Sequence, residues 1–177
     1  MVEHWIELTN LPAHGREFSF EDQDMWLERW QEFHLEVKAM QPIMATVTVF
    51  PQGEGYLISG RLTAVLEAMC HRCTDDARIE LDHSFDTFEA QEDAQSEPDG
   101  EVSHLRCTDS GWELNIADLL WEEFLLAMPE KILCSDTCLG LCPHCGKNRN
   151  QDHCVCSNLD SRSPLAKALQ GVKIKTN

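Results

Sequence analysis

Positive charge is scarce in this sequence of 177 residues, which has 14 lysines and arginines against 31 aspartates and glutamates. The formal net charge is −17 at pH 7, so the chain as a whole repels nucleic-acid phosphates at long range and attracts basic proteins. No apolar run approaches the length of a membrane span, and residues 1–5 lack the basic and apolar regions of a signal peptide. We therefore expect a cytoplasmic protein that has no membrane partner.

The sequence also lacks the residue patterns of common enzyme classes. It contains no Ser-His-Asp arrangement, no glycine-rich loop that would cradle phosphate and no H-E-x-x-H motif. Acidic residues are plentiful, but no spacing singles out a pair of carboxylates for acid–base work. These absences predict a protein that is not an enzyme and has no small-molecule substrate.

Charge is divided unevenly along the chain. Residues 1–130 hold 7 basic and 28 acidic side chains, whereas residues 131–177 hold 7 basic and 3 acidic side chains. Such asymmetry is typical of a protein whose two surfaces meet different partners, although acidity also simply keeps a protein dissolved. We predict an acidic, β-rich body over residues 1–130 and a basic, cysteine-rich tail over residues 131–177.

Alternation and β-branched residues predict an antiparallel β-meander in the body. Residues 43–50 and 56–69 are rich in such residues, and Gly60 is a candidate β-bulge in the second of these strands. Residues 79–86 alternate between apolar and polar side chains, which is typical of a strand with one face in water. Shorter strands are expected at residues 4–8, 104–107 and 112–114.

Two helices are expected to flank the sheet, which makes the fold class α+β. The first covers about residues 21–34, with Ser19 and Asp22 as capping signals. Its apolar face is typical of a core rather than of a base-stacking platform and consists of Trp26, Trp30, Phe33 and Val37. The second helix begins after Asn115 and ends at Pro129. Its apolar stripe consists of Ile116, Leu119, Leu120, Phe124 and Met128.

Two further segments have a distinctive composition. Residues 89–101 hold six acidic residues and no basic residue, which predicts a mobile, solvated loop or, alternatively, an attractive surface for a basic partner. Ser163, Pro164 and Gly171 are the start and stop signals of a short helix over residues 165–170.

Six of the nine cysteines lie between residues 134 and 156, and their spacing predicts a metal site. Cys142 and Cys145 form a C-x-x-C, and Cys154 and Cys156 form a C-x-C after eight intervening residues. Four thiolates about 2.3 Å from one ion make a closed tetrahedral zinc site, and two short pairs joined by a short loop are typical of such sites.

Two other close pairs remain, Cys70 with Cys73 after the second long strand and Cys134 with Cys138 after the second helix. We predict that these four bind a second zinc ion, which would hold the tail against the meander. In the rival arrangement, Cys134 and Cys138 supply ligands to one shared site, and the chain binds one ion. Cys107 is left over and is expected to be a small core residue.

Other uses of the cysteines fit the sequence less well. Disulfides need an oxidising compartment, of which the sequence gives no sign. A redox-active C-x-x-C normally opens a helix after a strand, and Pro143 with the turn after Cys145 is unfavourable to that helix. A catalytic zinc ion keeps an open coordination position. The histidines inside the clusters are alternative ligands, although the thiolates suffice: His71, His144 and His153.

Several motifs follow one another in a characteristic order. G-R-L-T-A at residues 60–64 leads into C-x-R-C at residues 70–73, and L-A-M-P ends the second helix. Residues 134–150 then read C-x-x-x-C-L-G-L-C-P-x-C-G-x-N-x-N, followed by the C-x-C pair. In these motifs, over about residues 40–170, the chain resembles the YceD family of bacterial and plastid proteins, named for large ribosomal RNA subunit accumulation. Thr74 departs from the common leucine, and the acidic loop looks like a variable region.

The resemblance implies a role in making or keeping large-subunit ribosomal RNA, with a ribosomal protein and this rRNA as the expected partners. In this interpretation the acidic body holds a basic ribosomal protein, and the zinc-ordered tail touches rRNA or that protein. The alternatives are a direct RNA-binding zinc module and, less favoured, a zinc or thiol enzyme. The expected RNA or partner contacts are the basic residues Lys147, Arg149, Arg162, Lys167, Lys173 and Lys175.

Overall fold

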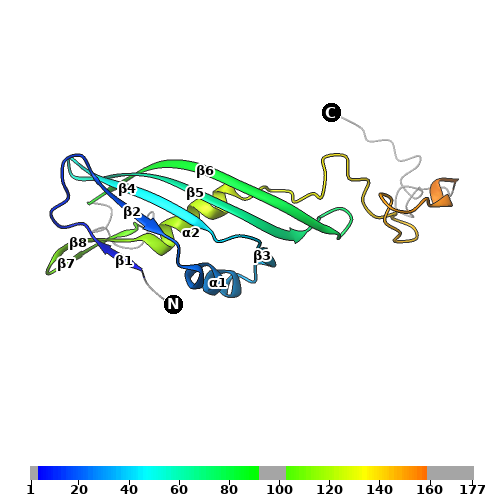
Figure 1. Ribbon diagram of the computed structural model, residues 1–177, viewed down its shortest axis with the longest axis horizontal. Coiled ribbons are helices and arrows are strands. Elements are labelled where there is room, and N and C mark those ends of the chain that lie inside the picture. The colour runs from blue at the N-terminus through cyan, green and yellow to red at the C-terminus, as the bar shows by residue number, and fades with distance from the viewer. Residues whose placement is uncertain (1–3, 92–102, 159–177) are drawn as a thin grey trace, which may run out of the picture.

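The structure, a computed structural model, describes residues 4–91 and 103–158, which form two antiparallel sheets and two α-helices (Figure 1). The larger sheet contains β2 (Arg16–Phe20), β3 (Val37–Ala39), β4 (Met44–Gln52), β5 (Gly55–Met69) and β6 (Asp76–Ala90). The smaller sheet contains β1 (Trp5–Glu7), β7 (Leu105–Thr108) and β8 (Gly111–Asn115). The helices are α1 (Gln23–Glu32) and α2 (Ile116–Ala127), and the 3-10 helix η2 covers Val155–Asn158. The predicted α+β class is confirmed.

The larger sheet is built around the meander of β4, β5 and β6. The strands β5 and β6 pair along 15 residues, and the inner side chains of β6 are buried while the intervening ones face water, as predicted. The expected bulge at Gly60 is wrong, because pairing runs through it from Val47 on one side to Phe85 on the other. A Cβ atom at Gly60 would collide with the ring of Phe85, so the glycine lets this ring lie across the strand.

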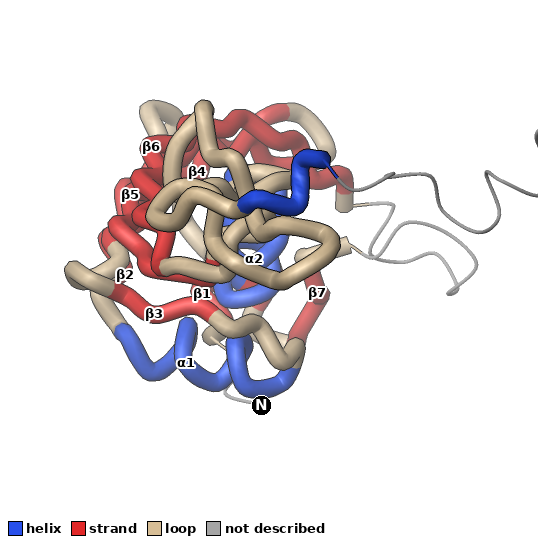
Figure 2. The backbone as a smooth tube through the Cα atoms, turned by 90° about the vertical axis from the view of Figure 1, so that its right-hand side faces the viewer, coloured by secondary structure: helices blue, strands red, loops and turns tan. Residues whose placement is uncertain are grey.

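Helix α2 lies against the inner face of the larger sheet, with α1 beside it (Figures 1 and 2). The ring of Phe124 on α2 is centred 5.5 Å from Trp26 and 6.2 Å from Trp30, both on α1. Ring pairs at such distances add packing energy to the burial of apolar area. The predicted core roles of these aromatic residues are confirmed. No helix among the described residues is long and apolar enough to cross a membrane.

The first helix differs from its prediction at both ends. Ser19 belongs to β2, and Asp22 alone caps the helix through its side chain. His34 has a φ of 51°, a left-handed conformation that stops a helix. Phe33 is the C-cap and is 54% exposed instead of lying in the core, and Val37 lies in β3 instead of on the helix face. Both β2 and β3 were absent from the prediction, because they are short strands that depend on the neighbouring strand for their pairing.

Two other expectations change. Strand β6 continues to Ala90, so Glu89 lies in a strand and not in an acidic loop; residues 92–101 of that loop fall outside the described residues, as does the helix expected over 165–170. Cys107 was wrongly assigned to the core and is exposed. It lies one residue pair from the end of the β7–β8 hairpin, beyond Leu105, which is buried.

Candidate metal centres

The first cysteine cluster lies where β5 turns into β6. Cys70 and Cys73 come from this turn, and Cys134 and Cys138 come from the segment after α2. The four Sγ atoms lie within 4.8 Å of one another, with Cys73 and Cys134 3.5 Å apart and Cys70 and Cys138 3.8 Å apart. Thiolates around one tetrahedral ion with Zn–S bonds of about 2.3 Å are about 3.8 Å apart, so the cluster fits a zinc-sized ion.

Backbone amides of the turn donate hydrogen bonds to the sulfur of Cys70. The amide of Thr74 donates to the carbonyl of Cys70 at 3.0 Å, and Thr74 has a φ of 63°, which closes the turn tightly. Burial opposes ionisation of Cys70, but the amides of Arg72, Cys73 and Cys134 outweigh it and lower its pKa to about 6. The turn is thus shaped to hold a thiolate, which is the form that binds metal.

The chain after α2 is attached to this turn by its backbone. The amide of His71 donates to the carbonyl of Ile132 at 2.8 Å, and the amide of Leu141 donates to the carbonyl of Arg72 at 3.0 Å. The guanidinium of Arg72 donates to the carbonyl of Cys138 at 3.0 Å. His71 Nδ1 accepts a hydrogen bond from the amide of Ile132 at 3.3 Å, so this nitrogen acts as a backbone support.

The second cluster lies wholly within the tail, which extends beyond the end of the larger sheet where β5 turns into β6 (Figure 1). Its members are Cys142, Cys145, Cys154 and Cys156, whose Sγ atoms also lie within 4.8 Å of one another. The amides of Cys145 and His144 donate to Cys142 and lower its pKa to about 6. Hydrogen bonding to the neighbouring Cys145 raises the pKa of Cys156 to about 12. The backbone of this loop thus favours the thiolate form of Cys142, which is the form that binds metal.

Side chains from the second loop reach the first cluster. Asn150 Nδ2 donates to Cys138 Sγ at 3.4 Å, and its Oδ1 accepts from the amide of Leu139 at 2.8 Å. The Asn150 hydrogen bond is the main reason why the pKa of Cys138 is lowered. Asn148 Nδ2 donates to Asp75 Oδ2, in the β5–β6 turn, at 2.6 Å. The predictions did not include these contacts, because the spacing of asparagines does not show which distant sulfur they will meet.

The remaining predicted residues are only partly placed. Lys147 and Arg149 are exposed on the loop of the second cluster, as are His144 and His153. The other four basic residues of the prediction lie outside the described residues: Arg162, Lys167, Lys173 and Lys175.

Each cluster offers four sulfur donors, which fill a tetrahedral shell and leave no position for a substrate. This donor set suits a structural ion rather than a catalytic one.

Comparison with models of protein families assigns the chain to one family. Residues 58–173 match the family model described as large ribosomal RNA subunit accumulation protein YceD. The chain belongs to the YceD family. The YceD match begins inside β5 and includes the eight cysteines of both clusters, whereas α1 and the strands β1 to β4 precede it. No curated protein and no solved structure gives a match to this YceD chain.

Proposed function

We propose that this YceD protein is a non-enzymatic, cytoplasmic factor that supports the accumulation of large-subunit ribosomal RNA. The observation that carries the proposal is the family match, which spans both cysteine clusters. The acidic body would bind a basic ribosomal protein, and the basic tail would touch rRNA or the same protein. Opposite charges steer such an association and make it sensitive to salt.

Zinc is the ion that we propose for both clusters, and its role would be to order the tail. In the described part of the tail, residues 131–158, Ile132 is the only side chain other than cysteine in the buried apolar core. So little apolar burial cannot offset the entropy of fixing the chain. Thiolate ligation by zinc supplies folding free energy directly and selects a soft ion over magnesium or calcium.

Depletion of the protein tests the cellular role. We expect the ratio of large-subunit to small-subunit rRNA to fall and precursors of the large-subunit rRNA to build up. Expression of the unaltered chain, or of the variant C107S at the isolated exposed cysteine, should restore the ratio, whereas C142S should not. A ratio that stays constant during depletion would contradict the proposal.

Binding to purified large-subunit ribosomal proteins tests the proposed partner. At least one basic protein should bind the zinc-loaded chain, and its affinity should fall as the salt concentration rises, because the Debye length is only about 8 Å at physiological ionic strength. Affinity that does not depend on salt would exclude the electrostatic mechanism.

The second candidate function is direct RNA binding by the tail, which the exposure of Lys147 and Arg149 favours. In that case the substitutions K147E and R149E should each weaken crosslinking to rRNA, since each removes a phosphate contact. The matched control is K38E on β3, which reverses an exposed charge of the body. Equal crosslinking by all three variants would exclude this candidate.

A further inference from the structure

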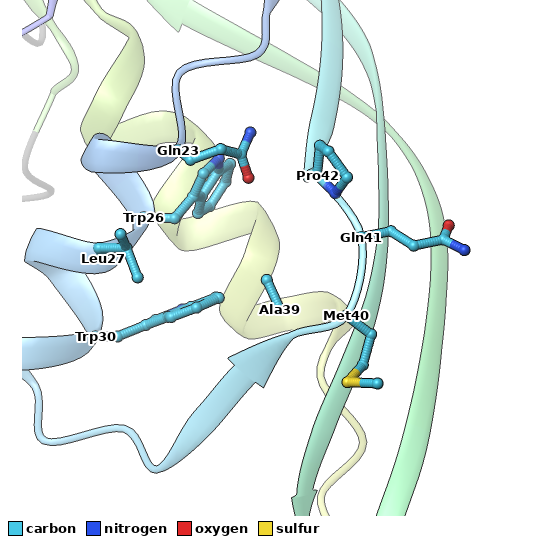
Figure 3. Close-up of a pocket in the computed structure, with 8 residues that line it drawn as sticks. All are labelled: Gln23, Trp26, Leu27, Trp30, Ala39, Met40, Gln41 and Pro42. Atoms are coloured by element: carbon cyan, nitrogen blue, oxygen red, sulfur yellow. The ribbon is translucent and has the colours of Figure 1, made fainter.

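An apolar groove runs along α1, outside the part of the chain that the YceD model matches. Figure 3 shows residues of α1 on one side and the segment from Ala39 to Pro42 on the other. The first hollow has a volume of about 280 Å³ and its apolar lining consists of Trp26, Leu27, Trp30, Ala39, Met40 and Pro42. A second hollow of about 420 Å³ shares Leu27 and Trp30 with the first, so the two lie side by side.

The walls of this groove are held in place before any partner binds. The side chain of Gln23 accepts from the amide of Ile43 at 2.9 Å and donates to its carbonyl at 3.0 Å, which ties α1 to the start of β4. Trp26 and Trp30 are only 2% and 5% exposed and pack on Phe124. By contrast, Leu27 and Met40 are 47% and 49% exposed, so apolar surface faces the open groove from both walls.

An acidic stripe runs along α1 next to the groove. Asp24, Glu28 and Glu32 are all exposed and follow one another at intervals of four residues, so they lie on one side of the helix. Like charges at this spacing destabilise a helix, and Glu32 adds negative charge at the end where the helix dipole is already negative. Arg29 lies on the same helix and pairs with Glu32 at 3.2 Å. The exposed carboxylates give this side of the helix a negative surface, which is complementary to a cationic partner.

We infer that the α1 groove binds an amphipathic, positively charged segment of a partner protein. Apolar side chains of that segment would enter the two hollows, and its lysines or arginines would lie over Asp24, Glu28 and Glu32. The inference rests on the proposed function in one respect, namely that the partner is a basic protein. A second copy of this chain is a poor occupant, because its acidic body would meet the acidic stripe.

The test uses methionine-methyl NMR of the zinc-loaded full chain. The probe is a synthetic peptide of about 14 residues, roughly four helical turns, in which leucine and lysine recur with helical spacing. Met40 in the groove and Met69 at the end of β5 are both 49% exposed, so Met69 is an internal control. Their signals would be assigned with M40L and M69L. We expect the peptide to shift the Met40 signal and to leave the Met69 signal in place.

Altered peptides and altered proteins separate the apolar and the charged contributions. Replacing leucine by serine in the peptide, or lysine by glutamate, should weaken binding about tenfold or more. The triple variant D24N/E28Q/E32Q should also lower the affinity about tenfold. The control D76N/E80Q/D86N neutralises three exposed acids of β6 and should leave the affinity unchanged. Equal shifts at Met40 and Met69, or equal effects of the two triple variants, would overturn the inference.

The peptide experiment and the depletion experiment can fail independently, so they test the groove and the ribosomal role separately. A Met40 shift together with an unchanged rRNA ratio on depletion would keep the groove and reject the ribosomal role. A fallen rRNA ratio with no shift of Met40 by the peptide would keep the role and reject the groove. A Met40 signal that moves with protein concentration in the absence of peptide would identify a second copy as the occupant and would also reject the inference.

Discussion

The body buries large apolar side chains, whereas the tail buries almost none. In the body, rings such as Trp26 and Phe124 and a row of aliphatic residues on β4 and β5 are 2% exposed or less. In the described part of the tail, the most deeply buried side chains are Cys138 and Cys142. Burial of apolar area fixes the body in one conformation, and we propose that the sulfur atoms of the two clusters fix the tail by surrounding bound ions.

The largest expected difference between body and tail is their response to removal of zinc. A structural zinc ion contributes an apparent free energy of about 10–16 kcal/mol, far more than the apolar contacts of the tail can replace. We expect chelation to expose residues 131–158 to proteolysis while the circular dichroism of the sheet persists. Native mass spectrometry should find two ions per chain, and one ion for C142S.

The substitution C107S is the matched control for these measurements, since Cys107 is exposed and lies outside both clusters. It should still bind two ions. One ion in the unaltered chain would reject the two-site arrangement, and simultaneous melting of body and tail would show that the first cluster makes them one unit.

A cavity in the body should destabilise the body and leave metal binding by the tail intact. The substitution F124A removes a ring that is 0% exposed and contacts both tryptophans of α1, and should cost about 3–5 kcal/mol. Urea unfolding followed by tryptophan fluorescence would measure this loss. The second cluster should still bind its ion in F124A, because it draws no ligand from the body. Loss of both ions would mean that the tail depends on the core of the body.

The contact between Asn150 and Cys138 tests the link between the two clusters. The substitution N150A should lower the metal affinity of the first cluster about 10- to 100-fold, as the loss of a hydrogen bond to a metal ligand typically does. Cobalt titration, read from the thiolate absorption bands, would show one weakened site and one unchanged site. D152A, at an exposed neighbouring position, should leave both unchanged. Equal weakening of both sites by N150A would indicate general unfolding of the loop.

The smallest expected effect is a pH dependence within the body. His104 is half-buried, and its Nδ1 lies 2.7 Å from Glu89 and its Nε2 3.3 Å from Glu122. Burial acts to lower the pKa of His104, but these two carboxylates, with Glu123, outweigh it and raise the pKa. The protonated ring therefore stabilises the fold fully below the unfolded pKa of about 6.5, and this stability is lost as the pH rises through the folded pKa.

The substitution H104Q should accordingly destabilise the zinc-loaded chain by about 1–3 kcal/mol more at pH 5.5 than at pH 9. Urea midpoints at the two pH values would measure the difference, with H14Q at an exposed histidine as control. A loss that is the same at both pH values would show that His104 acts by packing alone.

Local patterns were sufficient to predict much of the fold. Alternation along residues 79–86 and the cap at Asn115 depend only on near neighbours, and the structure has β6 and α2 there. The short strands β2 and β3 escaped prediction because each is defined by the strand beside it. Cys107 was misplaced for a similar reason, since burial depends on where the core ends and not on residue type.

The cysteine spacing by itself determined that this protein carries close pairs suited to a soft metal ion, and left open whether they form one site or two. Only the tertiary structure gathers Cys134 and Cys138 beside Cys70 and Cys73, more than 60 residues earlier, because α2 packs under the sheet and returns the chain to the β5–β6 turn. Contacts within the tail place Asn150 on Cys138, and α1 with the segment before β4 forms the groove. Spacing along the chain reports which ligands are available, and packing between distant elements decides which of them meet.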